Sequence, residues 1–317
     1  MRKLIGLILI VIFLSIGIYF FWPRGVISPL VNVKFSEKSL EKYDFDSLAK
    51  RQGVGSTIVI SEQIDNKKGR EISFVSDGKK VSGMLNWDGK YNKPIIIMIR
   101  GYAEKEGYYV GSGTWKVADE LARAGYATIS LDFLGYGNSD NESSDVLEAR
   151  FHKVIEVLDL IQSVKQLPWV DKNKIGIWAH SNGGQIALSV LEITGEKYPT
   201  VLWAPMTNPF PQSLIDTADE GEEKQKATDF VNLFLKYYDG RRYAFENYYE
   251  WINAPILIEQ GTADSQVKVE WQTEVVNNLQ LLNKDVELQI YDGADHNLKG
   301  SWDEAVKNDI KWYRIFW

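Results

Sequence analysis

The stretch that decides the fold is Lys174-Ile-Gly-Ile-Trp-Ala-His-Ser-Asn-Gly-Gly-Gln-Ile-Ala-Leu188. Its apolar first half is typical of a strand buried on both faces, and its second half begins a helix that continues to Thr194. Ser181 lies in the tight turn between them, which lifts a serine hydroxyl above the sheet edge. Such a crowded turn needs small residues two positions before and after the serine, and Ala179 and Gly183 meet that need. The motif predicts a nucleophile at position 181, with a helix N-cap as the alternative.

Short strands alternate with helices along the rest of the chain. Apolar runs predict strands at 71–75, 80–85, 94–99, 126–131, 174–179, 200–203, 255–259 and 286–291. Periodic apolar residues predict helices at 115–124, 145–167, 183–194, 269–281 and 301–312. The first two strands flank Asp77-Gly78, which predicts a hairpin turn. Buried strands joined by crossover helices predict an α/β fold with a doubly wound, mostly parallel sheet over residues 70–317.

One long segment of this domain, residues 205–254, lacks a strong buried strand. It carries an acidic cluster at 216–223 and a single predicted helix at about 227–238. In an α/β fold, an insertion of this size between two strands can form a cap over the site at the strand ends. We therefore expect a cap-like insertion, with a solvated surface excursion as the alternative.

A serine nucleophile needs a base within hydrogen-bond reach, and the sequence offers three histidines. His152 falls inside a predicted helix beside its apolar face, which favours a structural role. His180 adjoins Ser181 in a sharp turn and is expected to pack behind it. His296 follows the strand 286–291 in a strand-end loop, where α/β sheets place their sites. His296 is therefore the predicted base.

The base in turn needs a carboxylate that holds its tautomer and stabilises the imidazolium. Asp264 follows the strand 255–259 in another strand-end loop. The resulting chain order of serine, aspartate and histidine is the order found in α/β-hydrolases. Asp292 and Asp295 are the alternatives, but both lie so close to His296 in sequence that the loop would have to fold back on itself.

An acyl-transfer site also needs donors for the developing oxyanion. The amide of Asn182, directly after the predicted nucleophile, is one candidate. The loop after the strand 94–99 reads Arg100-Gly-Tyr-Ala103, and the amide of Tyr102 is the second candidate, with Gly101 permitting the turn. The alternative is an ordinary strand-to-helix loop.

These motifs resemble the α/β-hydrolase superfamily over roughly residues 70–315. Ala-His-Ser-Asn-Gly-Gly, the loop from Asp132 to Ser139, Gly-Thr-Ala-Asp-Ser-Gln-Val and Gly-Ala-Asp-His occur in the order typical of that superfamily. Within it, the strings 169–178 and 252–264 are similar to the catalytic domain of the prolyl oligopeptidase family and its small esterase relatives. One departure is Arg100-Gly101, where the family has His-Gly before its oxyanion donor.

The resemblance implies serine-dependent hydrolysis through an acyl-enzyme, with Ser181, Asp264 and His296 at the triad positions. The expected activity is that of a serine hydrolase acting on a small carboxylic ester or short-peptide substrate. An acyltransferase would use the same residues, and a catalytically silent binding module is a further alternative. The loop at Asp132 matches a structural turn in these enzymes.

Composition excludes several other classes of function. The 317 residues contain no cysteine, which excludes a disulfide scaffold, a thiolate metal site and a cysteine nucleophile. With 36 lysines and arginines against 43 aspartates and glutamates, the formal charge is −7, whereas nucleic-acid binding normally needs a basic face. No nucleic-acid partner, metal or organic cofactor is expected.

The N-terminus is predicted to enter a lipid bilayer. Residues 4–22 carry no charge, and a helix of this length spans roughly 28 Å, close to the thickness of the hydrocarbon core. Arg2 and Lys3 precede the segment, which favours a cytoplasmic N-terminus and an extracytoplasmic catalytic domain at the cell membrane. Residues 1–23 would then form a single-pass anchor and 24–69 a juxtamembrane linker and N-terminal extension. The alternative is secretion after signal-peptide cleavage.

Overall fold

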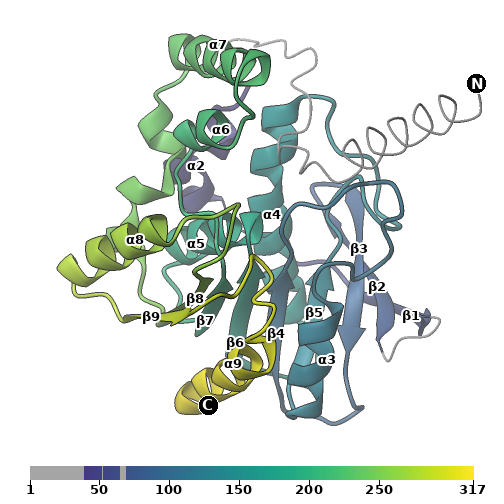
Figure 1. Ribbon diagram of the computed structural model, residues 1–317. Coiled ribbons are helices and arrows are strands. Elements are labelled where there is room, and N and C mark those ends of the chain that lie inside the picture. Colours follow the sequence, from purple (N-terminus) through teal and green to yellow (C-terminus); the bar gives the residue numbers. More distant parts are fainter. Residues whose placement is uncertain (1–38, 52, 65–68) are drawn as a thin grey trace, which may run out of the picture.

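The computed structural model describes residues 39–51, 53–64 and 69–317 (Figure 1). The predicted anchor at 4–22 lies outside these residues. Across the described ranges, no helix combines the length and the apolar character that crossing a membrane requires.

The centre of the molecule is a nine-stranded sheet in the order β1-β2-β3-β5-β4-β6-β7-β8-β9. Its strands are β1 (Val59–Gln63), β2 (Arg70–Ser76), β3 (Lys79–Asn86), β4 (Lys93–Ile99), β5 (Ala127–Leu131), β6 (Val170–His180), β7 (Thr200–Trp203), β8 (Ile256–Gly261) and β9 (Val286–Tyr291). The first three strands pair antiparallel, as β3 does with β5, and all pairs from β5 to β9 are parallel. The prediction of a mostly parallel α/β sheet is confirmed.

Helices cover both faces of this sheet (Figure 1). They are α3 (Trp115–Arg123), α4 (Val146–Val164), α5 (Asn182–Thr194), α8 (Val269–Leu281) and α9 (Trp302–Phe316). Alternate residues of β4 divide the core between the faces, because side chains along a strand point to opposite sides. Ile95 and Ile97 belong to the core cluster that includes residues of α4, α5 and α8, whereas Ile96 and Met98 belong to the cluster that includes residues of α3 and α9. The carboxyl ends of the parallel strands therefore share one edge of a well-covered sheet.

The N-terminal part of the described chain is more ordered than the sequence predicted. Within the range expected to be linker and extension lie a 3-10 helix η1 (Glu41–Tyr43), a short helix α2 (Phe45–Lys50) and β1. Arg51 then forms a bidentate ion pair with the buried Asp159 of α4, with N···O distances of 2.7 and 2.8 Å. Asp159 also accepts a hydrogen bond from Ser76. These contacts make residues from about 40 onward part of the domain.

The segment 205–254 forms helices α6 (Gln212–Asp216) and α7 (Glu222–Tyr237), followed by three 3-10 turns, η2 (Gly240–Tyr243), η3 (Phe245–Asn247) and η4 (Tyr249–Trp251). Figure 1 shows α6 and α7 at the top of the molecule, beyond α5. Phe210 and Phe234 anchor them in an aromatic cluster, their ring centroids 5.0 Å apart. Within the acidic cluster, Glu220 and Glu222 form i,i+4 ion pairs with lysines of α7.

Candidate active site

Ser181 stands at the carboxyl end of β6 and directly before α5, in a strained conformation. Its φ is +54° and its ψ −124°, a backbone geometry that residues with a side chain rarely adopt. The strain is held by hydrogen bonds on both sides, because the Ser181 amide donates to Trp203 and the Ser181 carbonyl accepts from Gly184 and Met206. The side chain is only 7% exposed. The turn thus presents one fixed serine at the sheet edge.

Close backbone approaches explain the glycines around this serine. A Cβ on Gly183 would lie 2.4 Å from the carbonyl oxygen of Ile99, and one on Gly184 would lie 2.3 Å from the Cβ of Pro205. Neither position has room for a side chain, because real Cβ atoms essentially never approach so closely. Ala179, two residues before the serine, is fully buried. The small residues identified in the sequence are therefore required by packing.

His296 and Asp264 meet at the ends of β9 and β8. The Nδ1 atom of the His296 ring lies 2.8 Å from the Oδ2 atom of Asp264. The second carboxylate oxygen of Asp264 accepts the amides of Gln266 and Val267 at 2.8 and 2.9 Å. Burial opposes ionisation of Asp264, but the hydrogen bond from His296 and these amides outweigh it, so the pKa of Asp264 lies below its usual value.

The loops that carry these two residues are joined to each other. The amide of Ala263 donates to the carbonyl oxygen of Ala294 at 2.9 Å, and that of Thr262 donates to Tyr291 at 3.0 Å. A Cβ on Gly261 would lie only 2.2 Å from the same Ala294 oxygen, so the backbones touch. Residues 32 positions apart are brought together because parallel β8 and β9 end at the same edge.

The alternative carboxylates serve other purposes. Asp292 accepts the hydroxyl of Thr262 at 3.1 Å. Asp295 accepts the amides of Asn297 and Lys299 at 2.9 and 3.0 Å, which closes the loop around His296. Among the described residues, Asp264 is the carboxylate hydrogen-bonded to the His296 ring.

His180, which was expected to pack behind the serine turn, contacts the loop that carries His296. Its Nε2–H donates to the backbone carbonyl of His296 at 2.9 Å, and the two ring centroids are 4.8 Å apart. Burial, followed by the nearby His296, lowers the pKa of His180 to about 4. His180 therefore stays neutral near pH 7 and keeps the proton that it donates.

A pH-dependent stability follows from this buried neutral ring. Between pH 6.5 and 4 the unfolded chain binds a proton at His180 that the folded chain does not, so stability falls as the pH drops through this window. The expected loss is about 1–3 kcal/mol. In His180→Gln the free energy of unfolding should change less between pH 7 and pH 4.5 than in wild type, as measured by urea titration. Equal pH dependence in both proteins would contradict this assignment.

Ser181 and His296 are both buried residues at this edge, each 7% exposed. No hydrogen bond joins them in the part of the chain that the structure describes. Hydrogen bonds between a nucleophile and its base are often long without substrate and tighten when the reacting group is bound. Because Nδ1 of His296 is occupied by Asp264, Nε2 is the nitrogen left for such a contact.

The predicted oxyanion donors border the serine. Asn182 is the first residue of α5, where backbone amides have no partner within the helix. On the other side, a Cβ on Gly101 would lie 2.8 Å from the Cβ of Ser181 and 3.4 Å from its Oγ. Gly101 thus brings the loop after β4 against the serine, and Tyr102 is the next residue.

Arg100 is a component that the sequence did not reveal as functional. The guanidinium is 3% exposed and donates to the carbonyl oxygens of Gly101 and Asp132 at 2.8 and 2.6 Å. It also lies 4.1 Å from the ring centroid of Tyr136. The carbonyl and N–H of a trans peptide point in opposite directions, so a bond to the Gly101 carbonyl fixes the direction of the Tyr102 amide. The only signal in the sequence was the departure from His-Gly.

A cleft of about 730 Å³ opens beside these residues. The residues that line it include Tyr102, Asn182, Arg150 and Lys153 of α4, and Phe230 of α7. This volume lies in the range of pockets for small organic ligands. Residues of the insertion 205–254 therefore line the same space as Asn182, the neighbour of Ser181.

Comparisons with known proteins agree with this architecture. A curated protein of Ajellomyces capsulatus named "Probable dipeptidyl-aminopeptidase B" is 22% identical over 262 residues, covering 74% of this chain and 27% of that protein. The chain spans about a third or less of the length of the curated relatives it matches.

Two solved structures show the same fold. Acetyl xylan esterase 1 from Thermoanaerobacterium sp. superposes with a TM-score of 0.64 at 17% identity, covering 90% of this chain and 96% of the esterase. Porphyromonas gingivalis dipeptidyl peptidase 4 gives 0.59 at 16% identity, covering 83% of this chain and 36% of the peptidase. The model of the prolyl oligopeptidase family matches residues 116–317, which include the strained serine and both strand-end loops. The chain therefore belongs to the prolyl oligopeptidase family of serine hydrolases.

Proposed function

We propose that this protein hydrolyses small carboxylic esters or short-peptide amides through an acyl-enzyme, with Ser181 as nucleophile, His296 as base and Asp264 as the orienting carboxylate. The observation that carries the proposal is the 2.8 Å contact between His296 and Asp264 at the edge where Ser181 is held in its strained turn. An imidazole that is paired with a carboxylate and lies at the same sheet edge as a serine is the arrangement that activates a hydroxyl.

In the first half-reaction, the Ser181 oxygen attacks the substrate carbonyl carbon while Nε2 of His296 takes the hydroxyl proton. The carbonyl oxygen becomes an oxyanion, which the amides of Asn182 and Tyr102 stabilise. The bond to the leaving group then breaks, and His296 returns its proton to the departing alcohol or amine. Water then repeats the sequence: it gives a proton to His296 and attacks the acyl carbon, and His296 returns that proton to the Ser181 oxygen as the acyl bond breaks and the acid is released.

The wall formed by α6 and α7 suits a cap that shields this chemistry from bulk water. An acyltransferase would differ only in the second half-reaction, where an alcohol replaces water. The cleft admits a small alcohol acceptor as readily as a small leaving group. Hydrolysis is nevertheless the simpler proposal, because water needs no binding site.

The decisive experiment is covalent labelling followed by turnover. A fluorophosphonate should phosphonylate wild-type protein, and mass spectrometry of the digest should place the adduct on Ser181. The same preparation should release acid from 4-nitrophenyl esters or amine from aminoacyl anilides. Folded protein that is neither labelled nor active would favour a silent binding module, and faster product formation with added alcohols would favour acyl transfer.

Arg100 is expected to act as a positioning residue for the oxyanion donor. Arg100→Met should lower kcat about 10- to 100-fold with little change in KM, because the Tyr102 amide remains but is no longer fixed; removing a donor outright typically costs 10²–10³. Arg100→Lys, which retains a donor, should recover part of the loss. Steady-state kinetics with one 4-nitrophenyl ester measures both variants. A rise in KM with unchanged kcat would show that Arg100 does not act on the transition state.

For the N-terminus we propose a membrane anchor at residues 4–22, supported by the uncharged run and the flanking Arg2 and Lys3. Full-length protein should then remain with membranes after a carbonate wash. Release of the protein by that wash, or mature chains that begin beyond residue 22, would contradict it.

A further inference from the structure

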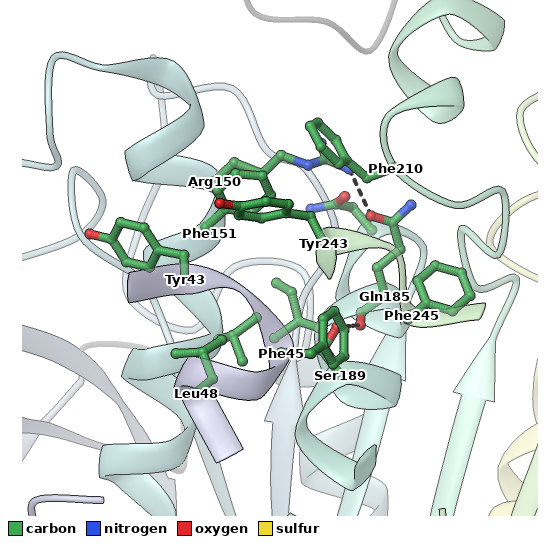
Figure 2. A pocket seen from close by; sticks show the side chains of 13 residues that line it. Tyr43, Phe45, Leu48, Arg150, Phe151, Gln185, Ser189, Phe210, Tyr243 and Phe245 are labelled. Atoms are coloured by element: carbon green, nitrogen blue, oxygen red, sulfur yellow. Dashed lines mark hydrogen bonds between the residues drawn. The ribbon is translucent and has the colours of Figure 1, made fainter. Parts of the chain in front are cut away.

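Two basic side chains of α4 face the cleft beside the proposed oxyanion donors. Arg150 and Lys153 are one helical turn apart and both line the same space as Tyr102 and Asn182. Arg150 also borders a smaller pocket of about 50 Å³, where Figure 2 shows its hydrogen bond to Gln185 beside the ring of Phe210. A substrate whose carbonyl reaches the donors therefore shares this cleft with the two cations.

Neither Arg150 nor Lys153 forms an ion pair with a described residue. Within the described residues, no carboxylate oxygen lies within 4.0 Å of the Arg150 or Lys153 nitrogens. Arg150 donates to the neutral amide oxygen of Gln185 at 2.7 Å and lies 5.8 Å from the Phe210 ring centroid. Lys153 Nζ lies 5.9 Å from the ring centroid of Phe133. Both positive charges therefore lack a carboxylate in ion-pair contact, although Glu142 and Glu156 act on Lys153 from a greater distance.

The surroundings of Arg150 and Lys153 do not remove their positive charges. Burial lowers the pKa of Arg150 to about 10 and, with a further contribution from nearby Arg100, that of Lys153 to about 8, so both remain protonated near pH 7. The nearest acidic groups have other partners. Glu142 pairs with Lys105 at 2.6 Å, and Glu156 accepts the amide of Leu134 at 2.9 Å.

The acidic groups that remain lie at the rim of the cleft. Glu104 and Glu106 are exposed to solvent, which screens their charge. Arg150 and Lys153 are partly buried, where electrostatic interactions are stronger. An anion entering the cleft therefore meets weak repulsion at the rim and strong attraction beside α4.

Resting on the function proposed above, we propose that Arg150 and Lys153 form an anion-binding subsite that selects ester or amide substrates bearing a carboxylate. An unpaired, partly desolvated cation is costly, and a substrate carboxylate relieves that cost while it is bound. The planar guanidinium of Arg150 can bind both carboxylate oxygens, and Lys153 adds a point charge. The subsite lies beside the donors, so this binding positions the reacting carbonyl.

The test compares matched substrates on the wild-type protein. Mono-4-nitrophenyl glutarate and 4-nitrophenyl pentanoate have acyl chains of equal length, and only the first carries a terminal carboxylate; 4-acetoxybenzoate and phenyl acetate place the same difference on the leaving group. We expect kcat/KM to be at least about tenfold higher for the anionic member of at least one pair. That ratio should fall as the ionic strength rises from about 0.02 to about 0.5 M.

Variants test whether the preference for anionic substrates depends on Arg150 and Lys153. Arg150→Gln keeps a donor for Gln185, and Lys153→Met keeps the aliphatic stem; each should reduce the ratio of anionic to neutral kcat/KM about tenfold, and Lys153→Arg should retain it. Lys226→Gln on α7, which removes an exposed charge paired with Glu222, is the matched control and should leave the ratio unchanged. Equal rates for both members of each pair, or a ratio that the α4 variants leave intact, would overturn the subsite. Hydrolysis of the neutral esters and phosphonylation of Ser181 would still stand, so this failure differs from that of the proposed function.

Discussion

Replacing Ser181 with alanine is expected to lower kcat about 10⁶-fold, to the level that binding and the oxyanion donors provide alone. The strained turn is built by the backbone, and alanine fills the same space as the serine without its hydroxyl. The variant should therefore fold normally and bind substrate with little change in affinity. Initial rates with a 4-nitrophenyl ester and labelling by a fluorophosphonate measure the loss.

A double variant measures whether Ser181 and His296 contribute to kcat as one unit. Residues that act as one unit are not additive, so Ser181→Ala/His296→Ala should be about as inactive as either single variant. A His296→Ala variant that retained more than about a tenth of the wild-type kcat would show that another group serves as the base.

Asp264→Asn is expected to cost about 10⁴ in kcat, because an amide cannot hold the His296 tautomer or stabilise the imidazolium. The contact of 2.8 Å that Asp264 makes with the ring predicts this size of effect. The loss should appear in kcat, since the carboxylate does not line the cleft. Steady-state rates between pH 6 and 9 measure it, with thermal unfolding as the check on folding.

Two other aspartates provide the controls for that substitution. Asp292→Asn and Asp295→Asn alter groups that bond to loop atoms rather than to the ring, so neither should approach a 10⁴-fold loss. Near-normal kcat in Asp264→Asn, together with a large loss in either control, would show that the control aspartate and not Asp264 orients the His296 ring.

The sheet could be predicted from the sequence because a local run of apolar residues marks each buried strand. The apolar runs at 200–203 and 286–291 and the helix at 269–281 appear in the structure with the predicted bounds. The proximity of Asp264 and His296 was also predictable, because parallel strands bring their carboxyl ends to one edge.

The rest depends on contacts between distant residues. The six residues of α2 are too short to be helical alone, and the adjoining Arg51 is held by Asp159, 108 positions away. Likewise, Arg100 acquires its role from carbonyls and tyrosine rings supplied by other loops. The cationic pair on α4 likewise lines a cleft whose other walls include residues of α6 and α7, which are distant in sequence.

The placement of the three proposed catalytic groups has a consequence for how the protein would lose activity. Ser181 directly follows β6 near the middle of the sheet, whereas Asp264 and His296 follow its last two strands. Proteins open locally before they melt, and outer strands are among the first parts to separate. Peeling of β9 from β8 would part the base from its carboxylate while the central strands stayed folded. Mild heating should therefore abolish the catalytic activity at temperatures at which most backbone amides are still protected from exchange with deuterium.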